Sequence, residues 1–270
     1  MTNKISILGP NYSYCHVLAL KAFPNSEFLM CQTIPEIFKN VFEGKTLQGL
    51  VPIENMIHGT VRESITSLQK YKIKINEAYD LPIHHCLASK NKDFKIISSK
   101  QEALSQCSIL LEEYKNLGLQ IADAPSTSKA METASQNPDY AAIGSLEAAK
   151  SLGLQIIREN VGDNHNNVTR FILISKRKSD EKLEDARTSL MIIPKKDRPG
   201  LLYEILSVFK EENVNLTKIE SIPTGKKLGD YEFFIEISGS LKEDRIIKAL
   251  NKLKTMQEVY PFGSYKLRTF

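Results

Sequence analysis

Short apolar segments that resemble strands alternate with helical patterns through most of the chain. The run KISIL, Lys4–Leu8, has the composition of a buried strand, and a helical pattern follows it after a Gly-Pro turn. Thr33 and Glu36 form a capping box, and Gly44 supplies a stop signal, so a helix is expected between them. This alternation predicts an α/β fold with parallel sheets, in which ligands bind where strands end and helices begin.

The same alternation continues beyond the first helices. Ser99 and Glu102 form a second capping-box pattern, which predicts one helix over the segment KQEALSQCSILLEEY. Further helices are expected to begin at Ser126 and Ser145, each after a short apolar strand. The pattern therefore extends to about residue 157 without an obvious break.

A charged segment of residues 177–186 divides the chain into a domain of residues 1–176 and a domain of residues 187–270. The second domain shows the order βαββαβ, which is typical of a ferredoxin-like module. Such a module is expected to expose one face of its sheet and one edge strand. Pairing with a second copy of the chain would cover them.

Composition excludes several classes of function. The net charge of +4 is spread along the chain, which disfavours nucleic-acid binding, and no apolar run is long enough to span a membrane. A cytoplasmic protein is therefore expected. The histidines show no metal-ligand spacing, and the four cysteines form no CxxC pair, so reduced and buried thiols are expected at Cys15, Cys31, Cys86 and Cys107.

Three polar segments lie where strands end and helices begin: residues 9–16, 54–59 and 126–128. Helix starts carry free N–H groups and positive partial charge, so an anionic ligand is expected there. The simpler alternative is that the hydroxyls only cap helices; it applies to Ser13, Ser126, Thr127 and Ser145.

A fourth polar segment, DNHNNVTRF, runs directly into a strand. Alternation along that strand places Thr169 and Phe171 on one face and Arg170 on the other. Thr169 adjoins the polar loop and is the better catalytic candidate, as a proton donor to a basic leaving group. A structural ion pair is the alternative role for Arg170.

The ordered motifs VPIENMIHG, APSTSKA, AAIGSLEAAKSLGLQII and NNVTRF resemble those of bacterial prephenate dehydratases. RPGLLYEILSVF, NLTKIESIP and GDYEFFIEISG resemble the ACT regulatory domain of that family. The resemblance implies a two-lobed catalytic domain like the periplasmic binding proteins, with the second lobe at about residues 78–159. It also implies conversion of prephenate to phenylpyruvate with loss of carbon dioxide and water, and no cofactor or metal.

The resemblance assigns roles to particular residues. Thr169 is expected to protonate the leaving hydroxyl, and prephenate is expected to contact Asn55, Ser126, Thr127, Ser13, Arg170 and Phe171. Phenylalanine is implied as a feedback effector bound between two ACT domains, in a homodimer or homotetramer. The residues expected at that effector site are Gly200, Leu201, Leu202, Glu220 and Ser221.

Several residues depart from the family motifs: Ser13 replaces a threonine, Cys15 a serine, and Lys100 and Gln101 a His-Pro pair, and four further changes bear on activity and regulation. Tyr12 replaces a glycine and is expected to disfavour a positive φ, Met56 replaces a serine, His58 an acidic residue, and Ile222 an arginine of the effector motif. These changes keep three alternatives open. They are a prephenate decarboxylase, although such relatives generally lack an ACT domain, an arogenate dehydratase, and a catalytically silent binding protein.

Overall fold

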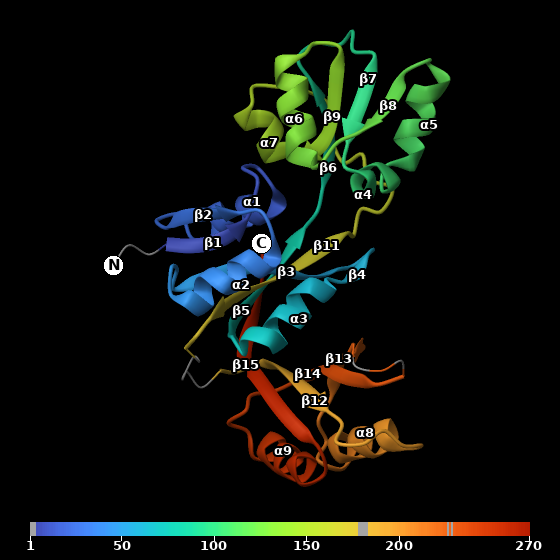
Figure 1. Ribbon diagram of the computed structural model, residues 1–270. Helices are drawn as coiled ribbons and strands as arrows, with labels where there is room; N and C mark the ends of the chain where they lie inside the picture. Colours follow the sequence, from blue (N-terminus) through green and yellow to red (C-terminus); the bar gives the residue numbers. More distant parts are fainter. Residues whose placement is uncertain (1–3, 178–182, 226, 228) are drawn as a thin grey trace.

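The computed structural model describes residues 4–177, 183–225, 227 and 229–270 of the chain. In space the molecule consists of three parts in a row, with the first lobe between the second lobe and the C-terminal domain (Figure 1). Most of the expected linker, residues 178–182, lies outside the described part. In that described part, no helix is both long and apolar enough to cross a membrane.

The first lobe joins N-terminal strands to one strand from much later in the chain. Its elements are β1 (Lys4–Leu8), α1 (Tyr14–Ala22), β2 (Glu27–Cys31), α2 (Ile34–Glu43), β3 (Gln48–Asn55), β4 (Gly59–Thr60), α3 (Arg62–Tyr71), β5 (Lys74–Pro82) and β11 (Val168–Ser175). Strands β2, β1 and β3 are parallel, but β11 lies between β3 and β5 and is antiparallel to both. The expectation of a purely parallel sheet is therefore wrong, because β11 enters from the opposite end of the sheet.

The capping box at the start of α2 is confirmed. The Thr33 hydroxyl accepts a hydrogen bond from the Glu36 N–H, and the Glu36 carboxylate accepts one from the Gln32 N–H. Gly44 ends the helix at a φ of 78°, in the left-handed region. The helix then buries Phe38 and its neighbours against the sheet.

The second lobe is a five-stranded sheet with helices around it. Its elements are β6 (His85–Ser89), β7 (Ile96–Ser99), α4 (Gln101–Ser105), α5 (Ser108–Asn116), β8 (Gln120–Asp123), α6 (Thr127–Gln136), β9 (Tyr140–Ser145), α7 (Leu146–Ser151) and β10 (Gln155–Arg158). The strand order is β10-β6-β9-β7-β8. The sheet is mixed, because β6 is antiparallel to both β9 and β10.

Three expectations about this lobe need correction. The chain leaves the first lobe after Pro82 rather than near residue 78, because Ala78 is still paired with Ile172 inside the first sheet. Ser99 does not cap a helix: it is the last residue of β7, and its hydroxyl donates to the Ile143 carbonyl. The expected single helix is also divided into α4 and α5.

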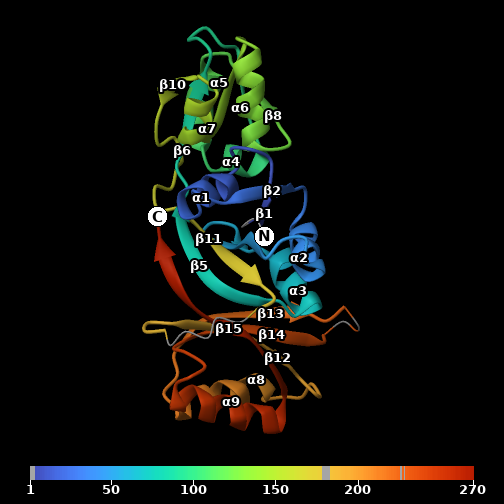
Figure 2. The ribbon, with the colours of Figure 1, turned by 90° about the vertical axis from the view of Figure 1, so that its left-hand side faces the viewer.

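The C-terminal domain has the predicted βαββαβ order. Its elements are β12 (Arg187–Ile193), α8 (Leu201–Glu211), β13 (Leu216–Pro223), β14 (Tyr231–Ser238), α9 (Asp244–Met256) and β15 (Glu258–Thr269). The strands lie in the order β13-β14-β12-β15, and α8 and α9 pack on one face of the sheet. Figure 2 shows both helices on the side away from the first lobe.

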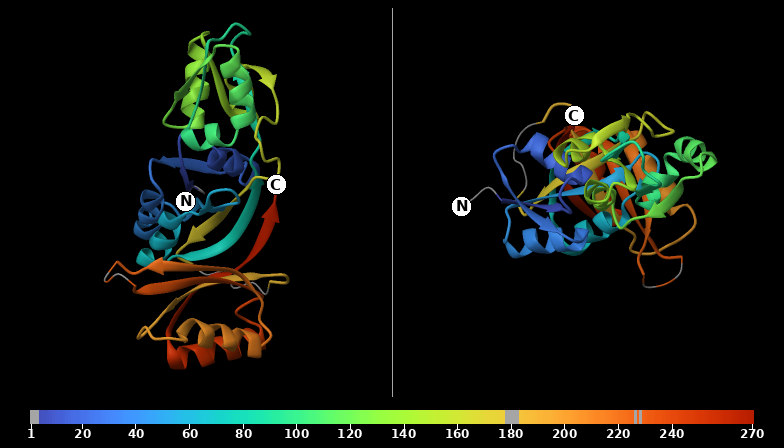
Figure 3. Two further views of the ribbon diagram at one scale, coloured as in Figure 1. Left: turned by 90° about the vertical axis from the view of Figure 1, so that its right-hand side faces the viewer. Right: turned by 90° about the horizontal axis from the view of Figure 1, so that it is seen from above.

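The other face of this sheet is not exposed, contrary to expectation. Met191, Ile222, Phe234 and Phe262 share one buried cluster with residues of α2, α3 and the first-lobe sheet. Strand β15 pairs with β12 and then continues alongside β5, so the two sheets are joined within one chain (Figure 3). The expected free edge is present in the described residues, because β13 is the end strand of the sheet.

Candidate active site

Asn55 and Thr169 lie directly opposite each other on the neighbouring strands β3 and β11. Nδ2 of Asn55 is 2.9 Å from Oγ1 of Thr169, and both residues are half-buried. Opposite residues on an antiparallel pair direct their side chains to the same face. The path of the chain through the second lobe and back therefore produces this contact between motifs that are 114 residues apart.

The orientation of the Asn55 amide is fixed by the backbone. Its Oδ1 accepts hydrogen bonds from the N–H groups of Ile57 and His58, each at 3.0 Å. Because backbone N–H groups can only donate, the other end of the amide must be the NH2 donor. Thr169 Oγ1 therefore accepts a hydrogen bond from Asn55, and the Thr169 proton is left free for another acceptor.

The two residues after Thr169 do not join it in a site. Phe171 is 3% exposed and packs in the core beneath α1, so the expected contact between its side chain and substrate is wrong in this structure. Arg170 points to the opposite face, where its Nε and Nη2 lie 2.7 and 2.9 Å from the two carboxylate oxygens of Asp80. The ion pair that was the alternative role for Arg170 is thus the role that the structure shows.

The expected helix-start residues are all found at helix starts. The Ser13 hydroxyl accepts from the His16 N–H and donates to the Leu8 carbonyl, and the Ser126 hydroxyl accepts from the Lys129 N–H. Thr127 is the first residue of α6, and Ser145 caps α7. Ser13, Ser126 and Ser145 therefore act as caps, which leaves the N–H groups of α1 and α6 as the available anion donors.

Tyr12 connects the two lobes at the start of α1. Its φ is 65°, so the expected obstacle to a positive φ did not prevent the left-handed conformation. Such a conformation in a bulky residue costs on the order of 1 kcal/mol or more. The side chain packs against a second-lobe cluster that includes Met131, Ala124 and Leu146, and this contact offsets the strain. The starts of α1 and α7 consequently face each other between the lobes.

Two residues near Thr169 were missed by the motif analysis. Asn167 is 2% exposed, and its Oδ1 lies 2.9 Å from Nδ2 of Asn55, while its own Nδ2 lies 2.9 Å from Oε1 of Gln106 in the second lobe. The repeated asparagines of DNHNN were the available signal for Asn167. Nothing local distinguishes Gln106, because its contacts form only when the lobes meet.

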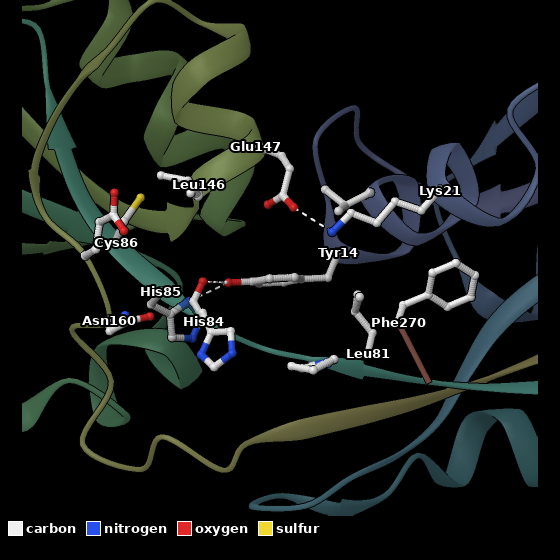
Figure 4. Close-up of a pocket in the computed structure, with 13 residues that line it drawn as sticks. Tyr14, Lys21, Leu81, His84, His85, Cys86, Leu146, Glu147, Asn160 and Phe270 are labelled. Atoms are coloured by element: carbon white, nitrogen blue, oxygen red, sulfur yellow. Dashed lines mark hydrogen bonds and ion pairs between the residues drawn. The ribbon is translucent and has the colours of Figure 1, made fainter. Parts of the chain in front are cut away.

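A cavity of about 330 Å³ lies between the lobes on the side of α1 and α7 (Figure 4). Tyr14 Oη is 2.8 Å from His85 Nδ1, and Lys21 Nζ is 2.8 Å from Glu147 Oε1 across the same gap. Burial raises the pKa of Tyr14 and lowers the pKa of His85, so both groups are neutral near pH 7. Thr169 is not among the residues that line this cavity. We therefore assign the Tyr14–His85 and Lys21–Glu147 contacts to holding the two lobes together.

The residues expected at the effector site fall into two groups. Gly200 is the N-cap of α8 with a φ of 82°, Leu202 is 36% exposed and Ser221 is exposed. Leu201, by contrast, is buried in the C-terminal core, so its side chain cannot contact a ligand. The Glu220 carboxylate accepts a hydrogen bond from Thr60 of the first lobe at 3.1 Å.

The substituted effector-motif residue, Ile222, faces the first lobe. It is 3% exposed and packs in the cluster shared by the two domains. An apolar side chain is therefore well suited to this position, and a change there acts first on the contact between domains.

The described residues contain no group of three His, Cys, Asp or Glu side chains arranged to hold a metal ion. All four cysteines are free and buried, as expected. The site between the lobes is therefore built from amides, hydroxyls and helix starts.

A two-lobed α/β module with an Asn–Thr pair near the lobe interface, followed by a ferredoxin-like domain, defines the class of the molecule. Residues 5–179 match the family prephenate dehydratase, and residues 196–255 match the ACT domain. The chain belongs to the prephenate dehydratase family and has the two-domain organisation of catalytic and ACT domains.

Similar proteins cover nearly the whole chain. A prephenate dehydratase of Lactococcus lactis subsp. lactis is 36% identical over 97% of both chains. A bifunctional chorismate mutase/prephenate dehydratase of Aquifex aeolicus is 36% identical over 97% of this chain and 73% of its own length. The crystal structure of a prephenate dehydratase from Arthrobacter aurescens in complex with L-Phe has a TM-score of 0.88 and 29% identity, over 97% of this chain and 89% of that one.

Proposed function

We propose that this chain is a prephenate dehydratase in which Thr169 is the proton donor. The reaction converts prephenate to phenylpyruvate and releases carbon dioxide and water. The observation that carries the proposal is the hydroxyl of Thr169, which accepts from Asn55 and keeps its proton free, in a chain of this family.

The Asn55–Thr169 geometry suits a proton transfer from a weak acid. As the C–O bond of the ring hydroxyl breaks, the Thr169 proton passes to the departing oxygen and water leaves. The C–C bond to the ring carboxylate breaks in the same process, and its electron pair completes the aromatic ring as carbon dioxide departs. The Asn55 Nδ2 donor, 2.9 Å away, stabilises the negative charge that develops on Thr169 Oγ1 until solvent returns a proton.

Prephenate carries two carboxylates, and the helix starts between the lobes suit such a dianion. Tyr12 packs against the second lobe and so brings the start of α1 close to that lobe. The first-turn N–H groups of α1 and α6 supply donors and positive partial charge at Ser13, Ser126 and Thr127. Arg170 serves the reaction indirectly, through its ion pair with Asp80.

The activity is tested by incubating the protein with prephenate and measuring phenylpyruvate by its absorbance in alkali. Thr169→Val keeps the shape of the side chain and removes the proton, so kcat should fall by a factor of about 100 to 10,000. Thr169→Ser, which keeps the hydroxyl, is the matched control and should retain most of the activity. Full turnover by Thr169→Val would exclude the proton-donor role.

The same assay separates the alternative functions. Consumption of prephenate to a non-aromatic acid would indicate a decarboxylase, and formation of phenylalanine from arogenate at a higher kcat/KM would indicate an arogenate dehydratase. Absence of any turnover would indicate a binding protein.

We infer that phenylalanine regulates the enzyme by binding to the C-terminal domain. The ACT family match and the L-Phe complex of the Arthrobacter aurescens relative support this inference. Gly200, Leu202 and Ser221 remain the candidate contacts, and the free edge of β13 offers a surface for a homodimer or for a tetramer of two dimers. Phenylalanine should inhibit turnover and raise Tm, and sedimentation should show an oligomer.

A further inference from the structure

The side chains of four residues and the backbone N–H of one of them, His58, form a closed ring of hydrogen bonds that joins the two lobes beside Thr169. The His58 N–H donates to Asn55 Oδ1 at 3.0 Å, and Asn55 Nδ2 donates to Asn167 Oδ1 at 2.9 Å. Asn167 Nδ2 in turn lies 2.9 Å from Gln106 Oε1, and Gln106 Nε2 lies 2.7 Å from His58 Nε2. The ring therefore begins and ends on His58, and it passes through Gln106 of the second lobe.

The backbone sets the direction of every bond in this ring. Asn55 Oδ1 faces N–H groups, which makes its Nδ2 a donor and makes the facing Asn167 oxygen an acceptor. Asn167 Nδ2 is therefore a donor and the facing Gln106 Oε1 an acceptor, which leaves Gln106 Nε2 as a donor toward His58. His58 Nε2 must therefore accept, which requires a neutral imidazole with its proton on Nδ1.

His85 contacts the Gln106 amide from the other side. Its Nε2 is 3.1 Å from Gln106 Oε1, and its Nδ1 faces the hydroxyl of Tyr14 at 2.8 Å. Burial lowers the pKa of His85, which favours the neutral imidazole. The Tyr14 hydroxyl also lies 3.0 Å from the His84 carbonyl and can donate to it, so the orientation of the Gln106 amide is set by Asn167 rather than by His85. Rotation of the Gln106 amide would turn its NH2 group toward the NH2 group of Asn167, so the contact with Asn167 opposes that rotation.

We propose that neutral His58 is a positioning residue for Thr169, and that its protonation opens the ring and lowers activity. A protonated imidazole presents N–H groups on both nitrogens, and one of them would face the NH2 group of Gln106. Two donors at 2.7 Å repel each other, so the contact between the exposed His58 side chain and Gln106 of the second lobe is lost. The loop that carries Asn55 then loses its link through His58 to the second lobe, so the lobes close less tightly beside Thr169. This inference rests on the proposed dehydratase activity.

The charges around His58 are of both signs. Glu102 on α4 is one of them: burial raises the pKa of Glu102, but Lys100 and, to a smaller extent, a positive charge on His58 lower it. The cavity that His58 lines has a volume of about 490 Å³ and includes the charged side chains of Glu54, Arg62, Lys218 and Glu220. These acidic and basic side chains have opposite effects on a charge at His58. The switch therefore depends on the match of donors and acceptors in the ring.

The test compares kcat/KM for prephenate from about pH 5.5 to about pH 8.5, the range in which histidines change charge. Wild type should lose activity on the acid side. His58→Gln supplies a neutral acceptor at every pH, so it should keep wild-type activity at the alkaline end and exceed wild type at least about fivefold at the acid end. His165→Gln, an exposed histidine after the second lobe, is the matched control and should keep the wild-type profile.

A second variant makes the role of the ring specific. Gln106→Glu places an acceptor opposite His58, so it should favour the protonated imidazole and shift its best activity toward acid pH. If kcat/KM falls toward acid pH in the same way in wild type and in His58→Gln, the proposal is overturned. An unchanged profile for Gln106→Glu would also overturn it.

Hydrogen exchange in the protein without substrate separates this proposal from the proposed function. In wild type, amides around Gln106 and Asn167 should exchange faster at acid pH, after correction for the intrinsic rate, whereas His58→Gln should show no such increase. Equal protection at both pH values would overturn the proposal even if the enzyme is active. If prephenate is not turned over, the exchange result still decides whether the ring opens.

Discussion

Arg170 of β11 and Glu236 of β14 approach to 3.6 Å across the boundary between the catalytic and C-terminal domains. Glu236 is 3% exposed and also accepts from Arg187, Thr217 and Tyr265. Because Arg170 follows Thr169 directly, a buried polar cluster of the ACT sheet lies one residue from the proposed proton donor. Movement of that sheet therefore has a short physical connection to the active site.

Glu236→Gln should weaken this boundary strongly. The substitution keeps the shape but removes the charge that compensates the two arginines, and it places an NH2 group among donors. Breaking a buried charged cluster in this way should lower the free energy of unfolding by about 3 kcal/mol, measured by urea denaturation. Glu258→Gln on the exposed part of β15 is the control and should change stability by less than about 0.5 kcal/mol.

The same glutamate should make the contact between domains sensitive to acid. Burial alone would raise the pKa of Glu236, but hydrogen bonds from Thr217 and Arg187 and the charge of Arg170 hold it below its ordinary value of 4.5. A depressed pKa contributes stability above the ordinary value, and that contribution is lost as pH falls through the folded-state pKa. The difference in unfolding free energy between wild type and Glu236→Gln should therefore shrink as pH is lowered below about 4.5. A constant difference would contradict this assignment.

Lys218 should transmit the state of the ACT domain to the active site. Its Nζ lies 2.7 Å from Glu54 Oε1, and Glu54 precedes Asn55 on β3. Lys218→Met keeps the length of the side chain and removes the ion pair. Phenylalanine should then inhibit at least about fivefold more weakly, while kcat/KM without effector stays within about twofold of wild type. Lys254→Met, on the exposed face of α9, should leave inhibition unchanged.

Sequence patterns predicted most of the helices and strands, because these depend on local periodicity, and the ordered motifs singled out Asn55 and Thr169 separately, which the structure brings into contact. They failed where a tertiary contact replaced a local one. Ser99 has a capping-box glutamate three residues later, yet its hydroxyl donates to the Ile143 carbonyl because β7 packs beside β9. The side chain found a partner in a neighbouring strand, and no local pattern can predict that.

The sheet of the C-terminal domain is a second example of a contact that sequence patterns do not predict. The βαββαβ order predicts one exposed face of this sheet unless a second copy of the chain covers it, and it does not identify what covers that face. A second copy of the chain was expected there, whereas Phe234 and Ile222 pack against the first lobe of the same chain. Likewise, Gln106 and His58 meet only because the lobes are closed, so their ring could not be predicted from spacing.

Gly263 should be required for β15 to pass from one sheet to the other. It has a φ of 143°, and a Cβ at this position would lie 2.6 Å from the backbone oxygen of Ile75. Gly263→Ala should therefore add both backbone strain and a clash and cost about 3 kcal/mol of unfolding free energy. Gly225→Ala, with a φ of 74° and nothing within 4 Å of the new Cβ, adds strain alone and should cost about 1 kcal/mol. Equal losses in the two variants would show that the Ile75 contact relaxes freely.

The cysteine thiols should be unreactive in the folded protein. Burial raises the pKa of Cys15, Cys86 and Cys107 to about 12, and it also raises the pKa of Cys31. At about pH 8, a thiol with that pKa is ionised to roughly one part in ten thousand, and the thiolate is the reactive form. Ellman's reagent should therefore modify the native protein only as fast as it unfolds, whereas all four thiols should react at once in denaturant. Rapid labelling of any one native thiol, located by mass spectrometry, would show that its surroundings open without global unfolding.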